Sequence, residues 1–207
     1  MKQIQQHLQQ IEEELEADQK NPTLWMEYGI GHHLSGIYEK AIESFRRSLE
    51  LNPSNAICHF NLGNSYMEAN RPEKAIDHYL QAIELKPDHI PSLTNLADAW
   101  EQAGDLEKSL ETFQYLVQLS PDTPLSHFNL GNFYLRNNQH LEASRSYEKT
   151  VELDPSFGDA WHNIAWILEN VGAIEEALNY AKKGLRFVPD HSELSELIQR
   201  LEQVTNS

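Results

Sequence analysis

The chain has 207 residues, of which 40% are apolar, so it is long enough for one ample core or a small array of repeats. It carries 32 acidic and 16 basic residues, a formal net charge of −16. Nucleic acids and anionic membranes are bound through clustered Lys and Arg, so this charge excludes both from the expected partners. We expect neutral or basic partners instead.

The amino-terminal segment, MKQIQQHLQQIEEELEADQ, is rich in Gln and Glu and has no apolar run long enough for a signal peptide or a membrane span. The single cysteine, Cys58, cannot form an internal disulfide, which favours a reducing compartment. We therefore expect a soluble, cytoplasmic protein. Within residues 3–19, helical spacing places Ile4, Leu8, Ile11 and Leu15 on one stripe and predicts a single helix that packs on the residues that follow.

A period of 34 residues runs through the rest of the chain. The string HFNLGN occurs at 59–64 and again at 127–132, two periods apart, and five prolines follow helix-like runs at the same interval: Pro53, Pro87, Pro121, Pro155 and Pro189. In residues 56–89, Leu62, Gly63 and Tyr66 share one face of a first predicted helix, and Ala75 and Tyr79 share one face of a second. Asn70 and Pro72 separate the two helices, since proline is tolerated where a helix begins. Each period therefore predicts a helix–turn–helix.

This pattern resembles the tetratricopeptide repeat, a 34-residue helix–turn–helix with the signature W-x2-L-G-x2-Y, then A-x3-F, then P. The resemblance covers 170 residues in five units: 22–55, 56–89, 90–123, 124–157 and 158–191. The small residue of the first helix is Gly29, Gly63, Ala97, Gly131 or Ala165, and that of the second helix is Ala41, Ala75, Ser109, Ala143 or Ala177. The aromatic residue four positions later is Phe45, Tyr79, Phe113 or Tyr147, and the fifth unit departs with Ala181. The first unit departs as well, with Tyr28 and His32 at signature positions.

The resemblance implies an all-α fold, a right-handed superhelical solenoid in which stacked units bury faces that one unit cannot bury alone. We expect residues 1–21 to form an N-terminal packing helix and residues 192–207 a C-terminal capping helix and tail. Ser192 is the predicted N-cap of that last helix. Its apolar stripe consists of Leu194, Leu197, Ile198, Leu201 and Val204.

In this family the first helices line a concave groove, and a column of asparagines recurs there. Asn61, Asn95, Asn129 and Asn163 occupy one position in successive units, with Asn64, Asp98 and Asn132 one turn further along. An amide offers both donors and an acceptor, which match the groups of a peptide backbone. The column is similar to the asparagine ladder in the repeat arm of O-linked N-acetylglucosamine transferase, which grips substrate peptides. Asparagine at these positions is also common in the family as a whole, so family consensus is the alternative explanation.

Apolar residues flank the column and form a second candidate contact. Phe60 and Phe128 are interpreted as anchors for apolar side chains of a ligand, with Trp166 at the corresponding face of the fifth unit. The alternative is that both phenylalanines pack against adjacent helices. Capture of a terminal carboxylate is excluded, because the positions that carry Lys or Arg in such repeats carry Met26, Ile30, Asn64, Asn61, Pro91 and Asn95 here. Groove charges are mostly acidic (Glu27, Glu68, Asp98, Glu101 and Glu169 against Arg136), which favours a partner with basic residues.

The sequence offers no catalytic, cofactor or metal motif. It lacks a phosphate loop, a dinucleotide fingerprint, G-x-S-x-G, H-E-x-x-H and paired cysteines, and no two of its ten histidines are four residues apart. We therefore expect a non-catalytic adaptor or scaffold that binds an extended peptide or a partner segment in the groove. Two alternatives remain, a self-assembling oligomeric scaffold and a substrate-recruiting subunit for an enzyme on another chain.

Overall fold

A computed structural model describes residues 2–205, with side chains from Ile4 onward. Met1, Asn206 and Ser207, which the sequence division assigns to the two end segments, lie outside the described residues. Within residues 2–205 the structure has twelve α-helices joined by turns and no strand, so the all-α prediction is confirmed. No helix within those residues is long and apolar enough to cross a bilayer.

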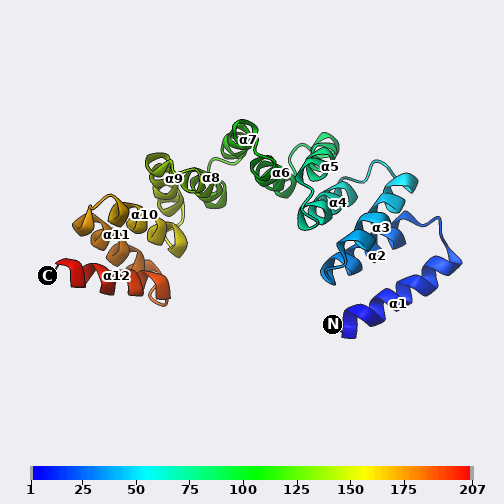
Figure 1. Cartoon of the computed structure of the whole chain (residues 1–207), viewed down its shortest axis with the longest axis horizontal. Coiled ribbons are helices and arrows are strands. Elements are labelled where there is room, and N and C mark those ends of the chain that lie inside the picture. The colour runs from blue at the N-terminus through cyan, green and yellow to red at the C-terminus, as the bar shows by residue number, and fades with distance from the viewer. Residues whose placement is uncertain (1, 206–207) are drawn as a thin grey trace. The chain divides into compact units, whose positions relative to one another are not determined.

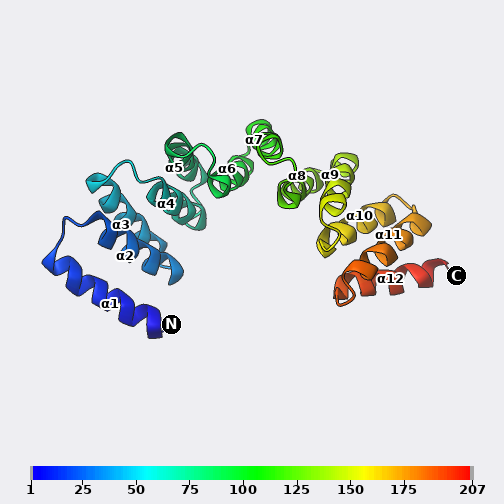
Figure 2. The same ribbon diagram turned by 180° about the vertical axis from the view of Figure 1, so that it is seen from behind.

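The helices follow one another with short turns between them. Their bounds are α1 Lys2–Ala17, α2 Pro22–Leu34, α3 Tyr38–Leu51, α4 Ala56–Glu68, α5 Pro72–Leu85, α6 Ile90–Gln102, α7 Leu106–Leu119, α8 Pro124–Arg136, α9 His140–Leu153, α10 Gly158–Asn170, α11 Ile174–Phe187 and α12 Ser192–Thr205. The chain forms two compact units, Met1–Thr112 and Phe113–Ser207, called here the N-terminal unit and the C-terminal unit. Within each unit, consecutive helices lie side by side as hairpins (Figures 1 and 2).

One residue with positive φ lies in each turn between the two helices of a repeat. Gly36, Gly104 and Gly172 have φ of 73°, 84° and 79°, and Asn70 and Asn138 have φ of 56° and 58°. These are the two residue types that enter the left-handed region at least cost, and they end the first helix of each pair. The turn at Asn70 agrees with the break expected there from the sequence.

The small residue of the first helix allows an aromatic ring of the second helix to lie directly on its backbone. A Cβ atom at Gly63 would be 2.5 Å from the ring of Tyr79, and one at Gly131 would be 2.6 Å from the ring of Tyr147. Both tyrosines are fully buried in the cores of their units. The pairing of Gly with an aromatic residue therefore sets how closely the two helices of a repeat approach.

Single helices cover the outer repeat at each end of the chain. α1 lies against α2 and buries Ile11 and Leu15, and Leu8 packs where Gly31 has no side chain. α12 buries Leu194, Leu197, Ile198 and Leu201 against α10 and α11, whereas Val204 is exposed.

The start of α12 differs from the prediction. Ser192 is its first helical residue, and the imidazole of His191 receives the backbone N–H of Leu194 at 3.3 Å. A histidine Nδ1 can replace the usual side-chain oxygen at an N-cap because it also has a lone pair directed at the free N–H groups. His89 at the N-cap of α6 makes the same contact with Ser92.

Candidate functional site on the first helices of the repeats

Each unit presents one candidate site, the surface formed by the first helices of its repeats, called here its first-helix face. In the N-terminal unit these helices are α2, α4 and α6, and in the C-terminal unit they are α8 and α10, followed by α12. The predicted ladder residues are half-buried in both units, so each has one side in contact with the protein and another facing solvent.

Asn64 holds other side chains of the N-terminal unit together. Its Oδ1 atom accepts a hydrogen bond from the hydroxyl of Tyr79 at 2.8 Å and another from Nδ2 of Asn95, also at 2.8 Å. Burial raises the pKa of Tyr79, so this hydroxyl stays protonated and remains a donor. Both lone pairs of the Asn64 oxygen are used, which makes Asn64 and Asn95 partly structural.

Asn61 is different, because its amide forms no hydrogen bond to the described residues of the N-terminal unit. It lies one turn before Asn64 on α4 and is half-buried. A half-buried amide retains its two donors and its acceptor for a ligand. The predicted column therefore contains two kinds of amide that the sequence does not distinguish.

The C-terminal unit repeats this division. Oδ1 of Asn132 accepts from the hydroxyl of Tyr147 at 2.8 Å, and Asn163 lies beside the same hydroxyl, where its hydrogen bond opposes the rise in the Tyr147 pKa caused by burial. Asn129 on α8 has no hydrogen bond from its amide to the described residues of this unit. Asn61 and Asn129 are thus the equivalent free amides of the two units.

The predicted aromatic anchors pack mainly on their own units. The Phe60 ring is 6.1 Å from that of Tyr79 and 5.1 Å from that of His89, and the Phe128 ring is 5.6 Å from Tyr147 and 4.9 Å from Phe157. Both are half-buried, and their packing supports the alternative given from the sequence. Trp166 is 37% exposed and has an edge contact with His140. The more accessible apolar residues are Ile57 and Leu125, which are 56% and 51% exposed.

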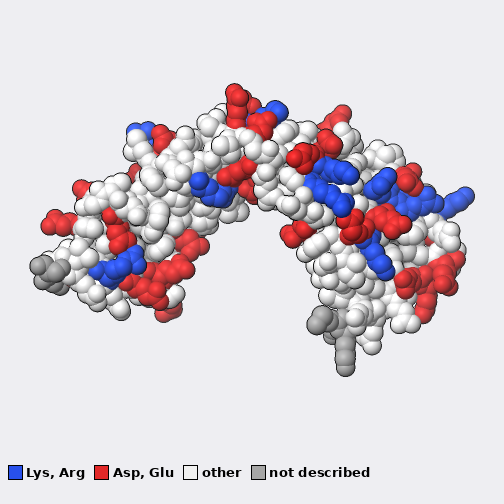
Figure 3. Space-filling model, in the orientation of Figure 1, with Lys and Arg blue, Asp and Glu red and all other residues white. Residues whose placement is uncertain are grey.

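Charge on the first-helix face is less one-sided than its sequence suggests. Glu169 forms a two-bond ion pair with Arg200 from α12, which lowers the pKa of the Glu169 carboxyl. Asp98, Glu101 and Arg136 also have partners. Figure 3 shows Lys and Arg gathered mainly over α3–α5 of the N-terminal unit, where acidic residues separate them. Glu27 and Glu68 remain as acidic residues of this face without an ion pair in their unit.

Several histidines have structural roles that periodicity alone did not reveal. One position near the start of the first helix carries a ring N–H that reaches the carbonyl oxygen six residues earlier. This contact joins Trp25 to Gln19 at 2.9 Å, His59 to Pro53 at 3.0 Å, His127 to Pro121 at 2.8 Å and Trp161 to Pro155 at 2.9 Å. His59 and His127 therefore take the place of the signature Trp.

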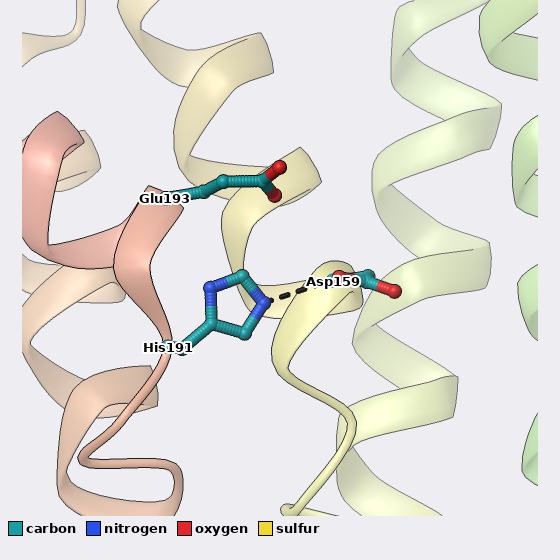
Figure 4. Close-up of side chains that lie close together, drawn as sticks. All are labelled: Asp159, His191 and Glu193. Atoms are coloured by element: carbon teal, nitrogen blue, oxygen red, sulfur yellow. Dashed lines mark hydrogen bonds and ion pairs between the residues drawn. The ribbon is translucent and has the colours of Figure 1, made fainter.

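A group of side chains in the C-terminal unit has ligand atoms that lie within 4.8 Å of one another: Asp159, His191 and Glu193 (Figure 4). Such a set could accept a divalent metal by residue type alone. However, Nε2 of His191 donates to Asp159 at 3.1 Å, and its Nδ1 receives the N–H of Leu194. A metal-binding histidine normally donates through its second nitrogen, so accepting there opposes metal binding. We conclude that the role of His191 is structural: it caps the start of α12 and is held there by Asp159 of α10.

Comparisons with known protein families and solved structures identify the same helix–turn–helix repeats. Tetratricopeptide repeat models match residues 56–89, 125–157 and 146–179, and a TPR repeat model matches 32–70. No curated protein matches the chain. Among solved structures, the chain is 25% identical to MamA protein (TM-score 0.68, covering 80% of this chain and 91% of that chain).

Two further solved structures show the same fold at lower identity. YrrB, described as a TPR protein with an unusual peptide-binding site, is 19% identical (TM-score 0.64, covering 90% of this chain and 96% of that chain). PilF of Pseudomonas aeruginosa is 18% identical (TM-score 0.70, covering 96% and 90%). The repeat signature, the helix hairpins and the matches to family models together show that this chain belongs to the tetratricopeptide repeat family.

Proposed function

We propose that this protein is a non-catalytic adaptor that binds an extended peptide segment of a protein partner on the first-helix face. The observation that carries the proposal is the free amide of Asn61, repeated at Asn129 in the other unit. Each lies at the same position of a first helix, one turn before a second amide that accepts a hydrogen bond from a buried tyrosine.

The chemistry of these amides suits a peptide backbone. An Asn side chain can donate to a carbonyl and accept from an N–H, so it holds main chain without selecting the ligand's side chains. The exposed Ile57 and Leu125 begin the same two helices and would cover apolar side chains of the ligand. Glu27 and Glu68 favour a ligand that also carries Lys or Arg.

The similar structures support a role of this class. YrrB is described as having an unusual peptide-binding site, and its fold matches nine-tenths of this chain. Most of the apolar stripe of α1 is packed against the repeats, with Ile11 and Leu15 buried and Leu8 over Gly31, which favours binding of a separate partner over self-assembly through that helix. In the proposed role the protein is soluble and cytoplasmic, and its partners include neither nucleic acid nor membrane.

The test is selection from a library of random ten-residue peptides, displayed on phage, by the full chain. Wild type is compared with Asn61→Ala plus Asn129→Ala, and with Asn52→Ala plus Asn179→Ala, two exposed asparagines of the same two units, as a control. We expect wild type and the control to enrich peptides that the amide variant does not retain. Equal enrichment by all three proteins would place binding elsewhere and overturn the proposal.

A further inference from the structure

The first repeat breaks the amide column, and a pocket lies at the break. Glu27 and Ile30 occupy the positions that carry Asn61 and Asn64 in the second repeat. Both line a pocket of about 340 Å³ within the N-terminal unit. The residues around it are Ile4, His7, Glu27, Ile30, Gly31 and Leu34.

One wall of this pocket comes from α1, a helix outside the repeats. Gly31 permits the close approach, since a Cβ there would be 2.6 Å from Leu8. Ile11 and Leu15 are buried along the same helix, and the hydroxyl of Tyr28 donates to Glu12. These contacts fix α1, so the pocket between Ile4 and Leu34 is held open by packed structure.

The lining indicates what the pocket would bind. Ile4, Ile30 and Leu34 supply apolar surface, and Leu34 is 65% exposed, the highest value among the large apolar residues of the described chain. Glu27 adds a half-buried carboxylate that has no ion pair within its unit. Burying an apolar side chain here removes its surface and that of Leu34 from water, while a neighbouring cation would satisfy Glu27.

We propose that this pocket is a specificity site for the same peptide, and that it takes an apolar side chain of Leu or Phe size next to a Lys or Arg. The proposal rests on the proposed function, because Asn61 and the pocket lie on neighbouring first helices of one unit. The amide of Asn61 holds backbone of any sequence, and the pocket selects which residue occupies one end of the bound segment.

The test uses a chemically synthesised library of ten-residue peptides with acetylated amino termini, so that side chains are its only cations. Three variants change the pocket. Glu27→Gln removes the charge at constant shape, and Ile30→Asn and Leu34→Glu install the residues that the second repeat carries at those positions. Leu80→Glu on α5, 44% exposed and outside the pocket, is the matched control.

We expect wild type and the Leu80→Glu variant to enrich peptides with an apolar residue beside Lys or Arg. Ile30→Asn and Leu34→Glu should lose the apolar preference and bind the selected peptide about tenfold more weakly. Glu27→Gln should keep the apolar preference and lose the basic one. These variants should still bind peptide through Asn61.

Peptide binding without an apolar or basic preference, or with a preference that the pocket variants leave unchanged, would overturn the specificity site while the proposed function stands. No enrichment by wild type would overturn both. Concentration-dependent dimerisation that Leu34→Glu abolishes, measured by sedimentation, would assign the pocket to a second copy of the chain and also contradict the proposal.

Discussion

At the scale of single residues, the structure separates amides that the sequence presents as equivalent. Asn64 and Asn61 differ by one turn of α4, yet only Asn64 serves Tyr79 and Asn95. A period of 34 residues places both on the first-helix face. It does not tell which of them faces a buried hydroxyl, because that depends on where the Tyr79 ring lies after packing.

Replacing Asn64 by Leu should lower the free energy of unfolding of the protein by about 1–3 kcal/mol, because the buried hydroxyl of Tyr79 loses its acceptor. Asn61→Leu should change that free energy by less than about 0.5 kcal/mol. Urea denaturation followed by circular dichroism measures both. Equal losses would show that Asn61 also has a structural role.

Position 63 must be glycine for a different reason: the ring of Tyr79 occupies the space that a side chain there would need. Gly63→Ala should destabilise the fold by about 1–3 kcal/mol, since a Cβ would be 2.5 Å from that ring. The cost should shrink in a Tyr79→Ala background, which reproduces the Ala165 and Ala181 pair of the fifth repeat. A double-mutant cycle from urea denaturation gives the coupling, and strict additivity would contradict this account.

The histidines provide a pH prediction. Burial, with further contributions from the neighbouring His59 and Arg46 that outweigh the opposing one from Asp77, lowers the pKa of His78 to about 4. Because the unfolded chain binds this proton near its ordinary pKa of 6.5, stability should be fully present above that pH and fall as the pH drops toward 4.

The matched variant is His78→Ser, since Ser44 and Ser146 occupy the equivalent position in other repeats. Wild type should lose about 1–2 kcal/mol more than this variant between pH 7 and pH 5. His32 and His89, whose pKa values burial also lowers, are common to both proteins, so the difference isolates His78. If urea titrations at each pH gave parallel stability curves for the two proteins, protonation of His78 would not be the cause of the loss.

At the scale of elements, the sequence predicts helices well because each repeat carries its own signals. Apolar spacing marks the helices, and Asn70 with Pro72 marks the turn between α4 and α5. The start of α12 was predicted one residue late, at Ser192, because a histidine is an unusual N-cap and only the structure shows His191 in contact with Leu194. The pocket beside α1 could not be predicted, since it depends on how Leu8 settles over Gly31.

The end helix α12 tests which contacts hold an element in place. Leu201 is fully buried, whereas Arg200 next to it forms an ion pair with Glu169 near the surface. Leu201→Ala should therefore cost about 2–4 kcal/mol of stability, and Arg200→Ala less than about 1 kcal/mol. Thermal unfolding should show this order. A larger loss for Arg200→Ala would mean that the ion pair, and not apolar burial, docks α12.

At the scale of the whole molecule, family and fold could be read from the sequence, and the partner could not. The signature occurs in five repeats, so it can be recognised despite the departures at Tyr28, His32 and Ala181. Ligand contacts depend on the residues that the signature leaves free, and these differ between repeats. The contacts proposed at the free amides and at the pocket involve residues of this kind, and their surroundings are set by packing that the repeat signature does not specify.

Nuclear magnetic resonance can show whether Asn61 and Asn129, each in its own unit, contact bound peptide through their side-chain amides. Side-chain amide signals of ¹⁵N-labelled protein are followed while a library-selected peptide is added, with each signal assigned from its Asn→Gln variant. We expect the signals of Asn61 and Asn129 to shift progressively to saturation, while that of Asn138 in an exposed turn stays unchanged. Saturation of binding with both signals unmoved would contradict this expectation.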